Sequence, residues 1–215
     1  LGAREFVSLL VKQLRMKILV VGPDFALGYK REGDIPTLRD LGVELGFRVI
    51  VLDPETVNGQ RIRSRVLRKM VTLGDVDGAS VMLGRSFCIS GVVIEGDHRG
   101  KDLGFPTANL DLQPDILIPK NGIYATWAKI GETRKQSVTS IGVRPTFGEG
   151  PRRVEVFILD FASDIYGETV SLEFVSFLRD EVLFHTVNDL VQQMNLDVEV
   201  TRTIIDGNAR KEIAR

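Results

Sequence analysis

The stretch "FCISGVVIEG", from Phe87 to Gly96, marks the point where the pattern of the chain changes. It is short, rich in β-branched residues and closed by a glycine, which is typical of a strand. Four similar runs follow, separated by turn-forming residues: "GIYATWAKI" from Gly122, "QSVTSIGV" from Gln136, "RRVEVFILDF" from Arg152 and "TVSLEFVSFL" from Thr169. This succession predicts an all-β barrel or sandwich.

The residues before this point alternate between strand and helix patterns. Apolar runs predict buried strands, and Asp34 is a candidate N-cap for a helix with a glycine at its end. This order predicts a parallel, nucleotide-binding type of layer, although two strands are too few for an independently stable sheet. The predicted strands are Lys17–Gly22 and Phe47–Leu52, and the helices end at Gly46, Gly74 and Gly84.

After Asp180 the pattern becomes helical, and the predicted helix opens with Asn188 and Asp189. Apolar residues recur at the spacing of one helix face, at positions 187, 190, 191, 194 and 198. We therefore predict two parts, an α/β module over residues 1–84 and a β domain with a C-terminal helix over residues 85–215. The fold class is α+β.

Composition excludes several classes of protein. The net charge of −1 argues against general binding to nucleic acid or membranes, and no apolar run approaches the roughly 20 residues that span a bilayer. Cys88 is the only cysteine, so we expect a reducing, cytoplasmic location. The first residues show no basic, apolar and cleavage pattern of a signal peptide, and because the sequence begins with Leu1 we expect a fragment of a longer protein.

The loop "EGDHRGKDLG", from Glu95 to Gly104, combines glycines with the cations Arg99 and Lys101. Glycines such as Gly96 and Gly100 let backbone N–H groups approach phosphate oxygens, and a lysine adds a point charge. The segment does not match the P-loop pattern. Taken alone, it is better explained as a solvated hairpin loop.

Pro106 precedes two small oxygen-bearing side chains, Thr107 and Asn109. If the segment is extended, both side chains point to the same side, where neutral oxygens suit Mg²⁺ that takes its other ligands from phosphates. A turn in which these side chains bond to their own backbone explains them equally well.

Glu155 stands in a predicted strand and shares its face with Phe157 and Leu159. A carboxylate there is either paired with Arg152 or Arg153 as a structural ion pair, or a general base at the edge of a pocket. As a base, it would accept the proton of a hydroxyl substrate during phosphoryl transfer.

Together these segments resemble the riboflavin kinase family. The resemblance covers about residues 84–206 and includes the PTAN tetrapeptide, the downstream glutamate, a Tyr-Gly pair and a Leu-Arg pair. The segments that carry it are "GVVIEGDHRGKDLGFPTANL", "PKNGIYATWAKI", "SIGVRPTFGEGPRRVEVFILDF", "IYGETVSLEFVSFLRDEVLF" and "DLVQQMNLD". The first part looks like the tail of the adenylyltransferase module in bacterial bifunctional riboflavin kinase/FAD synthetases.

The resemblance implies phosphorylation of the riboflavin 5′-hydroxyl by Mg-ATP, giving FMN and ADP. It also implies a six-stranded Greek-key barrel with a C-terminal helix, preceded by a partial Rossmann-like module. Its site residues are Glu155 as catalytic base, Thr107 and Asn109 for Mg²⁺, Thr107 with Gly96, Arg99, Gly100 and Lys101 for the nucleotide, and Arg179 and Glu181 for the flavin. The C-terminal helix would help to wall the isoalloxazine ring.

The first part departs from the family pattern. The H-x-G-H signature of the adenylyltransferase is absent, since the two histidines are His98 and His185. The I-S-S-[ST]-x-I-R element appears as "IRSRVLR" (Ile62–Arg68), and Leu27 replaces an aromatic residue of the family. We therefore predict no FAD synthesis from this chain. Arg144 stands where an asparagine is common in the kinase, a change that could alter contacts to the flavin.

Two alternatives stay open beside a riboflavin kinase. The chain could derive from a bifunctional parent that also adenylylates FMN to FAD, or it could be a non-catalytic flavin-binding module. In each case we expect small-molecule partners, namely riboflavin, FMN, ATP and ADP, with no nucleic acid or membrane. The sequence does not indicate which proteins, if any, bind to this chain.

Overall fold

The structure is a computed structural model that describes residues 1–96, 100, 103–143 and 152–213, with residues 208–213 described by their backbone alone. Its contacts divide the chain into two compact units, Leu1–Ile62 and Arg63–Arg215. Each unit is described below by itself. No helix in the described residues is both long enough and apolar enough to cross a membrane.

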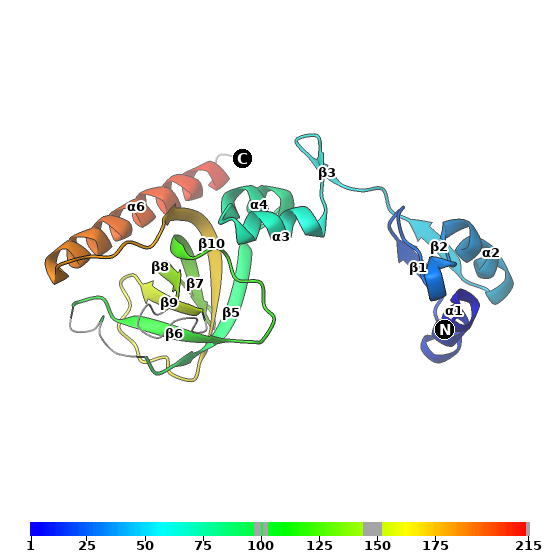
Figure 1. Ribbon diagram of the computed structural model, residues 1–215, viewed down its shortest axis with the longest axis horizontal. Coiled ribbons are helices and arrows are strands. Elements are labelled where there is room, and N and C mark those ends of the chain that lie inside the picture. Colours follow the sequence, from blue (N-terminus) through cyan, green and yellow to red (C-terminus); the bar gives the residue numbers. More distant parts are fainter. Residues whose placement is uncertain (97–99, 101–102, 144–151, 214–215) are drawn as a thin grey trace. The chain divides into compact units, whose positions relative to one another are not determined.

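The first unit is a small α/β layer (Figure 1). The two predicted strands form and pair in parallel, with Ile18 opposite Arg48 and Val21 opposite Val51. The short antiparallel pair near the end of this unit, and the helix at its start, were not predicted. The elements are α1 (Ala3–Leu14), β1 (Ile18–Val21), the 3₁₀ turn η1 (Tyr29–Arg31), α2 (Ile35–Leu45), β2 (Arg48–Val51), β3 (Thr56–Val57) and β4 (Gln60–Arg61).

The helix α2 begins and ends where the sequence predicts. The carboxylate of Asp34 accepts a hydrogen bond of 3.0 Å from the backbone N–H of Thr37, which satisfies one of the free donors of the first turn. Gly46 follows the helix with φ of 76°, a left-handed conformation that glycine adopts without strain. Leu38 and Leu41 then pack with Val7 and Phe47 in the core of this unit.

The opposite face of the β1–β2 pair is open. Ile18, Val20, Ile50 and Leu52 are between 39% and 56% exposed, whereas Leu19 and Val49 pack against the core on the helix side. Parallel sheets are normally covered on both faces. The expectation that two strands make an incomplete sheet is therefore consistent with this exposed apolar face.

The second unit is built around a closed barrel (Figure 1). Helices lie before and after the strands along the chain. The elements are α3 (Ser64–Thr72), α4 (Val76–Leu83), β5 (Phe87–Ile94), β6 (Thr107–Leu112), β7 (Gly122–Ile130), β8 (Thr133–Gly142), β9 (Arg153–Ile158), β10 (Thr169–Arg179) and α6 (Val187–Ile213).

The barrel strands run in the order β10-β5-β6-β9-β8-β7, and every neighbouring pair is antiparallel. The consecutive strands β7, β8 and β9 form a meander, and β10 returns to lie beside β7, which is a Greek key. The predicted six-stranded Greek-key barrel is confirmed. Alternate residues fill its interior, including the fully buried Tyr124, Phe174 and Ile89.

The helices α3 and α4 belong with the barrel by their contacts. Val76 is 0% exposed and forms part of the barrel core. The hydroxyl of Ser176 on β10 donates a 2.8 Å hydrogen bond to the carboxylate of Asp77 on α4. Contacts thus divide the chain after Ile62, while the division into modules 1–84 and 85–215 stays a prediction about the family's organisation.

The C-terminal helix α6 packs on β7, β8 and β10 (Figure 1). Its start is fixed by Thr186, whose hydroxyl accepts a 3.1 Å hydrogen bond from the backbone N–H of Asp189. Farther along the helix, Arg202 forms an exposed ion pair of 2.9 Å with Asp160. The predicted helix is confirmed, and its backbone continues to Ile213.

Candidate active site

Three predicted residues lie on neighbouring strands at the outer face of the barrel. In β6, Ala108 and Leu110 pack toward the core, so Thr107 and Asn109 face outward. Asn109 lies directly opposite Glu155 of β9. The conditional prediction that this segment is extended is confirmed, and the alternative of a local turn is not, because both residues belong to a strand.

A third strand extends this outward row. Glu155 is also opposite Ser140 of β8. The side chain of Glu155 therefore lies between a carboxamide on one neighbouring strand and a hydroxyl on the other. Close cross-strand neighbours have Cβ atoms about 5 Å apart, near enough for one small substrate to reach all three.

Part of this row opens into a cavity of about 320 Å³ between the barrel and α6. Five predicted site residues line the cavity, namely Gly100, Thr107, Glu155, Arg179 and Glu181. Most of the remaining lining is apolar. It comprises Leu103, Phe105, Ile123, Val138, Phe157, Val182, Phe184, Leu190, Met194 and Val198, together with Ser140 and Asp197.

Thr107 also lines a second cavity of about 300 Å³. This cavity is formed by strand residues such as Val93 and Val156 and by the segment 161–166 after β9. Thr107 and its neighbours therefore separate two spaces of similar size. Two ligands bound in these spaces would meet at Thr107.

Asn109 does not line either of these cavities. It borders a separate groove of about 510 Å³ with Glu95, Asp111 and Arg152. Its link to the other predicted site residues is its position opposite Glu155. Arg99 and Lys101 lie outside the described residues, as does Arg144.

The predicted loop glycines approach the PTAN segment closely. A Cβ atom at Gly96 would collide with the carboxamide of Asn109, and one at Gly100 would collide with the carbonyl oxygen of Phe105. A larger residue at Gly100 would push the loop away from the backbone of Phe105. Glycine is needed at Gly100 because the obstacle there is backbone, whereas at Gly96 a larger residue would have to displace the side chain of Asn109.

One structural alternative for Glu155 was an ion pair with Arg152. The guanidinium of Arg152 is instead bonded to the segment before β7. Its Nε donates a 2.7 Å hydrogen bond to Asn121, and its other nitrogens donate to the carbonyl oxygens of Ile118 and Pro119. Arg152 thus stabilises this loop, and partial burial lowers the pKa of its guanidinium.

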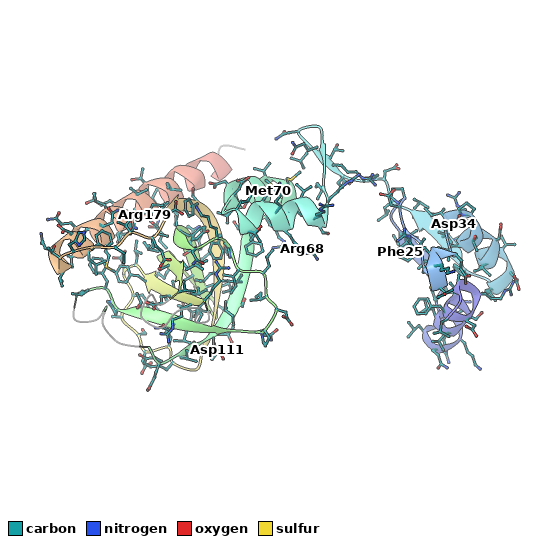
Figure 2. All side chains as sticks on the ribbon, viewed as in Figure 1. Phe25, Asp34, Arg68, Met70, Asp111 and Arg179 are labelled. Atoms are coloured by element: carbon teal, nitrogen blue, oxygen red, sulfur yellow. The ribbon has the colours of Figure 1, made fainter. Side chains whose placement is uncertain are left out.

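Arg179 closes the end of the cavity beside α6, and Figure 2 shows it on the side of the barrel that carries this helix. Its Nε and Nη2 donate hydrogen bonds of 2.9 and 2.7 Å to the two carboxylate oxygens of Asp197. Gln193 donates a further bond of 3.0 Å to the same carboxylate. Sequence reasoning missed Asp197 and Gln193.

A signal for Asp197 was present in the sequence. Asp197 lies three residues after Met194 and seven after Leu190, so it shares the apolar face of the helix. A carboxylate at a buried helix position needs a partner. The pattern predicts a buried pair, although it does not identify Arg179 as the partner.

Glu181 follows Arg179 in the cavity wall. Partial burial raises the pKa of its carboxyl group, and the charges of Arg152 and Arg179 oppose this effect. A Cβ atom at Gly142 would collide with this carboxylate, so Glu181 lies close against the backbone of β8.

Among the described residues, no group of three or more His, Cys, Asp or Glu side chains could hold a metal ion. The oxygen donors nearest to Glu155 in the outward row are neutral, and such donors fit a hard cation that takes further oxygens from a bound phosphate. The described carboxylates alone do not form a site for a cation here.

Comparisons with known proteins identify the family of this chain and agree with its fold. The riboflavin kinase family model matches residues 83–205, and the FAD synthetase model matches residues 1–66. The bifunctional riboflavin kinase/FMN adenylyltransferase of Listeria monocytogenes is 34% identical over 94% of this chain and 64% of its own length. That of Escherichia coli is 38% identical over 92% of this chain and 63% of its own length.

A solved structure gives the same result for the fold. The crystal structure of a Streptococcus pneumoniae protein, named as a macrolide-efflux protein, superposes with a TM-score of 0.84 and 34% sequence identity. The matched region covers 94% of this chain and 65% of the pneumococcal chain. The chain thus spans about 64% of the length of the curated relatives, with the adenylyltransferase module only partly present. With more than half of its residues matched by one family model, the chain belongs to the riboflavin kinase family.

Proposed function

We propose that this protein transfers the γ-phosphate of Mg-ATP to the 5′-hydroxyl of riboflavin, giving FMN and ADP. The observation that carries the proposal is the position of Asn109 directly opposite Glu155, which lines the 320 Å³ cavity. Thr107 lines this cavity and also the 300 Å³ cavity next to it. This arrangement offers a base, neutral metal ligands and space for two substrates within one small region.

The 320 Å³ cavity is suited to the flavin. Its lining is mostly apolar and includes three phenylalanines, Phe105, Phe157 and Phe184. Such walls suit a flat aromatic ring such as isoalloxazine, and a few polar groups suffice to orient it. Arg179 and Glu181 are the proposed flavin-binding residues, and α6 supplies one wall.

The 300 Å³ cavity on the other side of Thr107 is suited to the nucleotide base. The phosphates would then extend toward Thr107 and the glycine loop. Gly96 and Gly100 lie against the PTAN segment, so backbone N–H groups can approach phosphate oxygens there. Arg99 and Lys101 of this loop would add positive charge.

Thr107 and Asn109 would hold Mg²⁺ together with oxygens of the nucleotide. Bound Mg²⁺ would neutralise charge on the transferring phosphoryl group. Pro106 restricts the backbone before Thr107, so the strand presents both ligands with little loss of conformational freedom.

Glu155 performs the proton transfer in this mechanism. Its carboxylate orients the 5′-hydroxyl of riboflavin and accepts its proton while the hydroxyl oxygen bonds to the γ-phosphorus. The bond between that phosphorus and the bridging oxygen of ATP breaks, and ADP leaves with the electron pair. The proton then passes from Glu155 to solvent.

The test is an assay with riboflavin, ATP and Mg²⁺ in which FMN and FAD are separated. We expect FMN as the product, and no FAD when FMN and ATP are supplied. Riboflavin binding without FMN formation would favour the non-catalytic alternative. FAD formation would show that the adenylyltransferase site is complete, contrary to our prediction for the first unit.

A further inference from the structure

The wall of the flavin cavity contains an ion pair whose partners come from different elements. Arg179 is the last residue of β10, and Asp197 lies in the middle of α6. The guanidinium and the carboxylate meet side by side through two hydrogen bonds of 2.9 and 2.7 Å. This two-point geometry is the strongest form of such a pair.

The pair is closely packed, and the polar atoms of both side chains take part in hydrogen bonds. Asp197 is 5% exposed, and its Oδ1 also accepts a 3.0 Å bond from Gln193. The remaining guanidinium nitrogen of Arg179, Nη1, donates 3.0 Å to the carbonyl oxygen of Asp180. The guanidinium is therefore fixed in position, and its positive charge is balanced by an adjacent buried carboxylate.

This balance affects the charge that the described residues give to the cavity. Among the described lining residues, Arg179 is the one cation, and the carboxylates are Glu155, Glu181 and Asp197. With Arg179 balanced by Asp197, Glu155 and Glu181 leave an excess of negative charge among these lining residues, although Arg152 and Arg179 partly offset the charge of Glu181. A neutral flavin alcohol enters such a cavity without electrostatic cost, whereas a flavin phosphate is repelled.

We propose that Asp197 is a positioning and specificity-determining residue. It holds Arg179 in the cavity wall and cancels its charge, so that the cavity prefers riboflavin to the phosphorylated product. This inference rests on the proposed function, because it assumes that the cavity binds the flavin. It gives Arg179 a role in shaping the wall rather than in binding a phosphate.

Asp197→Asn tests the proposal with little change in shape. The variant leaves Arg179 as an unbalanced cation in the cavity. Riboflavin should bind about fivefold more weakly because Arg179 is less firmly held, and the affinity for FMN relative to riboflavin should rise about tenfold. Titration of the intact chain with each flavin, without nucleotide, measures both values, and added salt should reduce the shift.

Arg179→Gln provides a second variant of opposite sign. It leaves the carboxylate of Asp197 unbalanced, so the affinity for FMN relative to riboflavin should fall rather than rise. A purely structural role would weaken both flavins equally in both variants. If Asp197→Asn failed to fold, the direction of the shift in Arg179→Gln would still decide the matter.

The matched control is Asp160→Asn. Asp160 pairs with Arg202, which also joins α6 to the barrel but lies outside the cavity lining. This variant should leave the ratio of the two affinities unchanged. The proposal is overturned if the ratio stays constant in Asp197→Asn and Arg179→Gln, or if Asp160→Asn shifts it as strongly.

The unmodified chain separates this inference from the proposed function. If it binds and phosphorylates riboflavin while the variants keep its affinity ratio, the inference alone is wrong. If it neither binds nor phosphorylates riboflavin, the proposed function is wrong and the inference falls with it.

Discussion

At the scale of single residues, the candidate site depends on how Thr107 and Asn109 of β6 lie relative to Glu155 of β9. Alternation along one strand predicts that Thr107 and Asn109 share a side, and the structure confirms this. That Asn109 lies opposite Glu155 depends on the register between β6 and β9, which are not consecutive in the chain. A register between distant segments is set by the whole barrel rather than by local sequence.

Asn109→Ala removes one proposed Mg²⁺ ligand. We expect the Mg²⁺ concentration for half-maximal FMN formation to rise roughly tenfold, because the ion loses one oxygen of the protein. A titration with Mg²⁺ at saturating riboflavin and ATP measures it. Asp111→Asn, on the same strand and outward face, is the control, and an unaltered titration in Asn109→Ala would remove that residue from the metal site.

Tyr124 links the barrel core to the segment before β7, and its hydroxyl donates a 2.6 Å hydrogen bond to the carbonyl oxygen of Lys120. Burial raises the pKa of Tyr124 from 10.0 to about 12. Between these two values the unfolded chain has lost the proton that the folded chain keeps. The free energy of unfolding should therefore fall as the pH rises from 10 to 12.

Tyr124→Phe tests this directly. The variant should be less stable by about 1 kcal/mol at pH 8, because the carbonyl of Lys120 loses its donor. Its free energy of unfolding should fall less steeply than that of the unmodified chain between pH 10 and 12. Denaturant titrations at several pH values measure both effects, and identical slopes would contradict the account.

At the scale of elements, the sequence predicts whether a segment forms a helix or a strand better than it predicts which other element that segment contacts. The apolar spacing in α6 predicts a helix, and the Asp34 and Gly46 signals correctly bound α2. The contact between Asp197 and Arg179 could not be predicted, because it depends on how α6 packs on β10. The helix α1 was not predicted, because its N-cap residue is Gly2, which has no side chain that could mark the start of a helix.

The position of α4 in the barrel core is a second feature that depends on packing rather than on local sequence. Its short sequence predicts a helix, but not that Val76 enters the barrel core at 0% exposure. Val76→Ala should lower the free energy of unfolding of the second unit by about 2 kcal/mol, because it leaves a cavity in that core. Denaturant titration measures this change.

Val81→Ala is the matched control on the same helix, since Val81 is 56% exposed. It should change the free energy of unfolding by less than about 0.5 kcal/mol. Equal effects of the two substitutions would show that α4 does not form part of the barrel core.

At the scale of the whole molecule, the division of the contacts after Ile62 has a direct consequence. The sequence pattern changes near Phe87. The helices α3 and α4 precede this point in the chain, yet they pack with the barrel that follows it. The open apolar face of β1 and β2 shows in physical terms why two strands make an incomplete sheet.

A fragment of residues 63–215 should therefore fold and phosphorylate riboflavin at a rate close to that of the whole chain. A fragment of residues 85–215 lacks α3 and α4 and should be less stable, because Val76 no longer fills the core. Thermal unfolding and FMN formation compare the two. An inactive or aggregated 63–215 fragment would contradict the division after Ile62.

The most direct test of the central claim is Glu155→Gln, assayed for FMN formation from riboflavin and Mg-ATP together with riboflavin binding. The variant keeps the size of the side chain but cannot accept the proton of the 5′-hydroxyl. We expect a rate lower by roughly a hundredfold or more, with riboflavin still bound. An unchanged rate of FMN formation would contradict it.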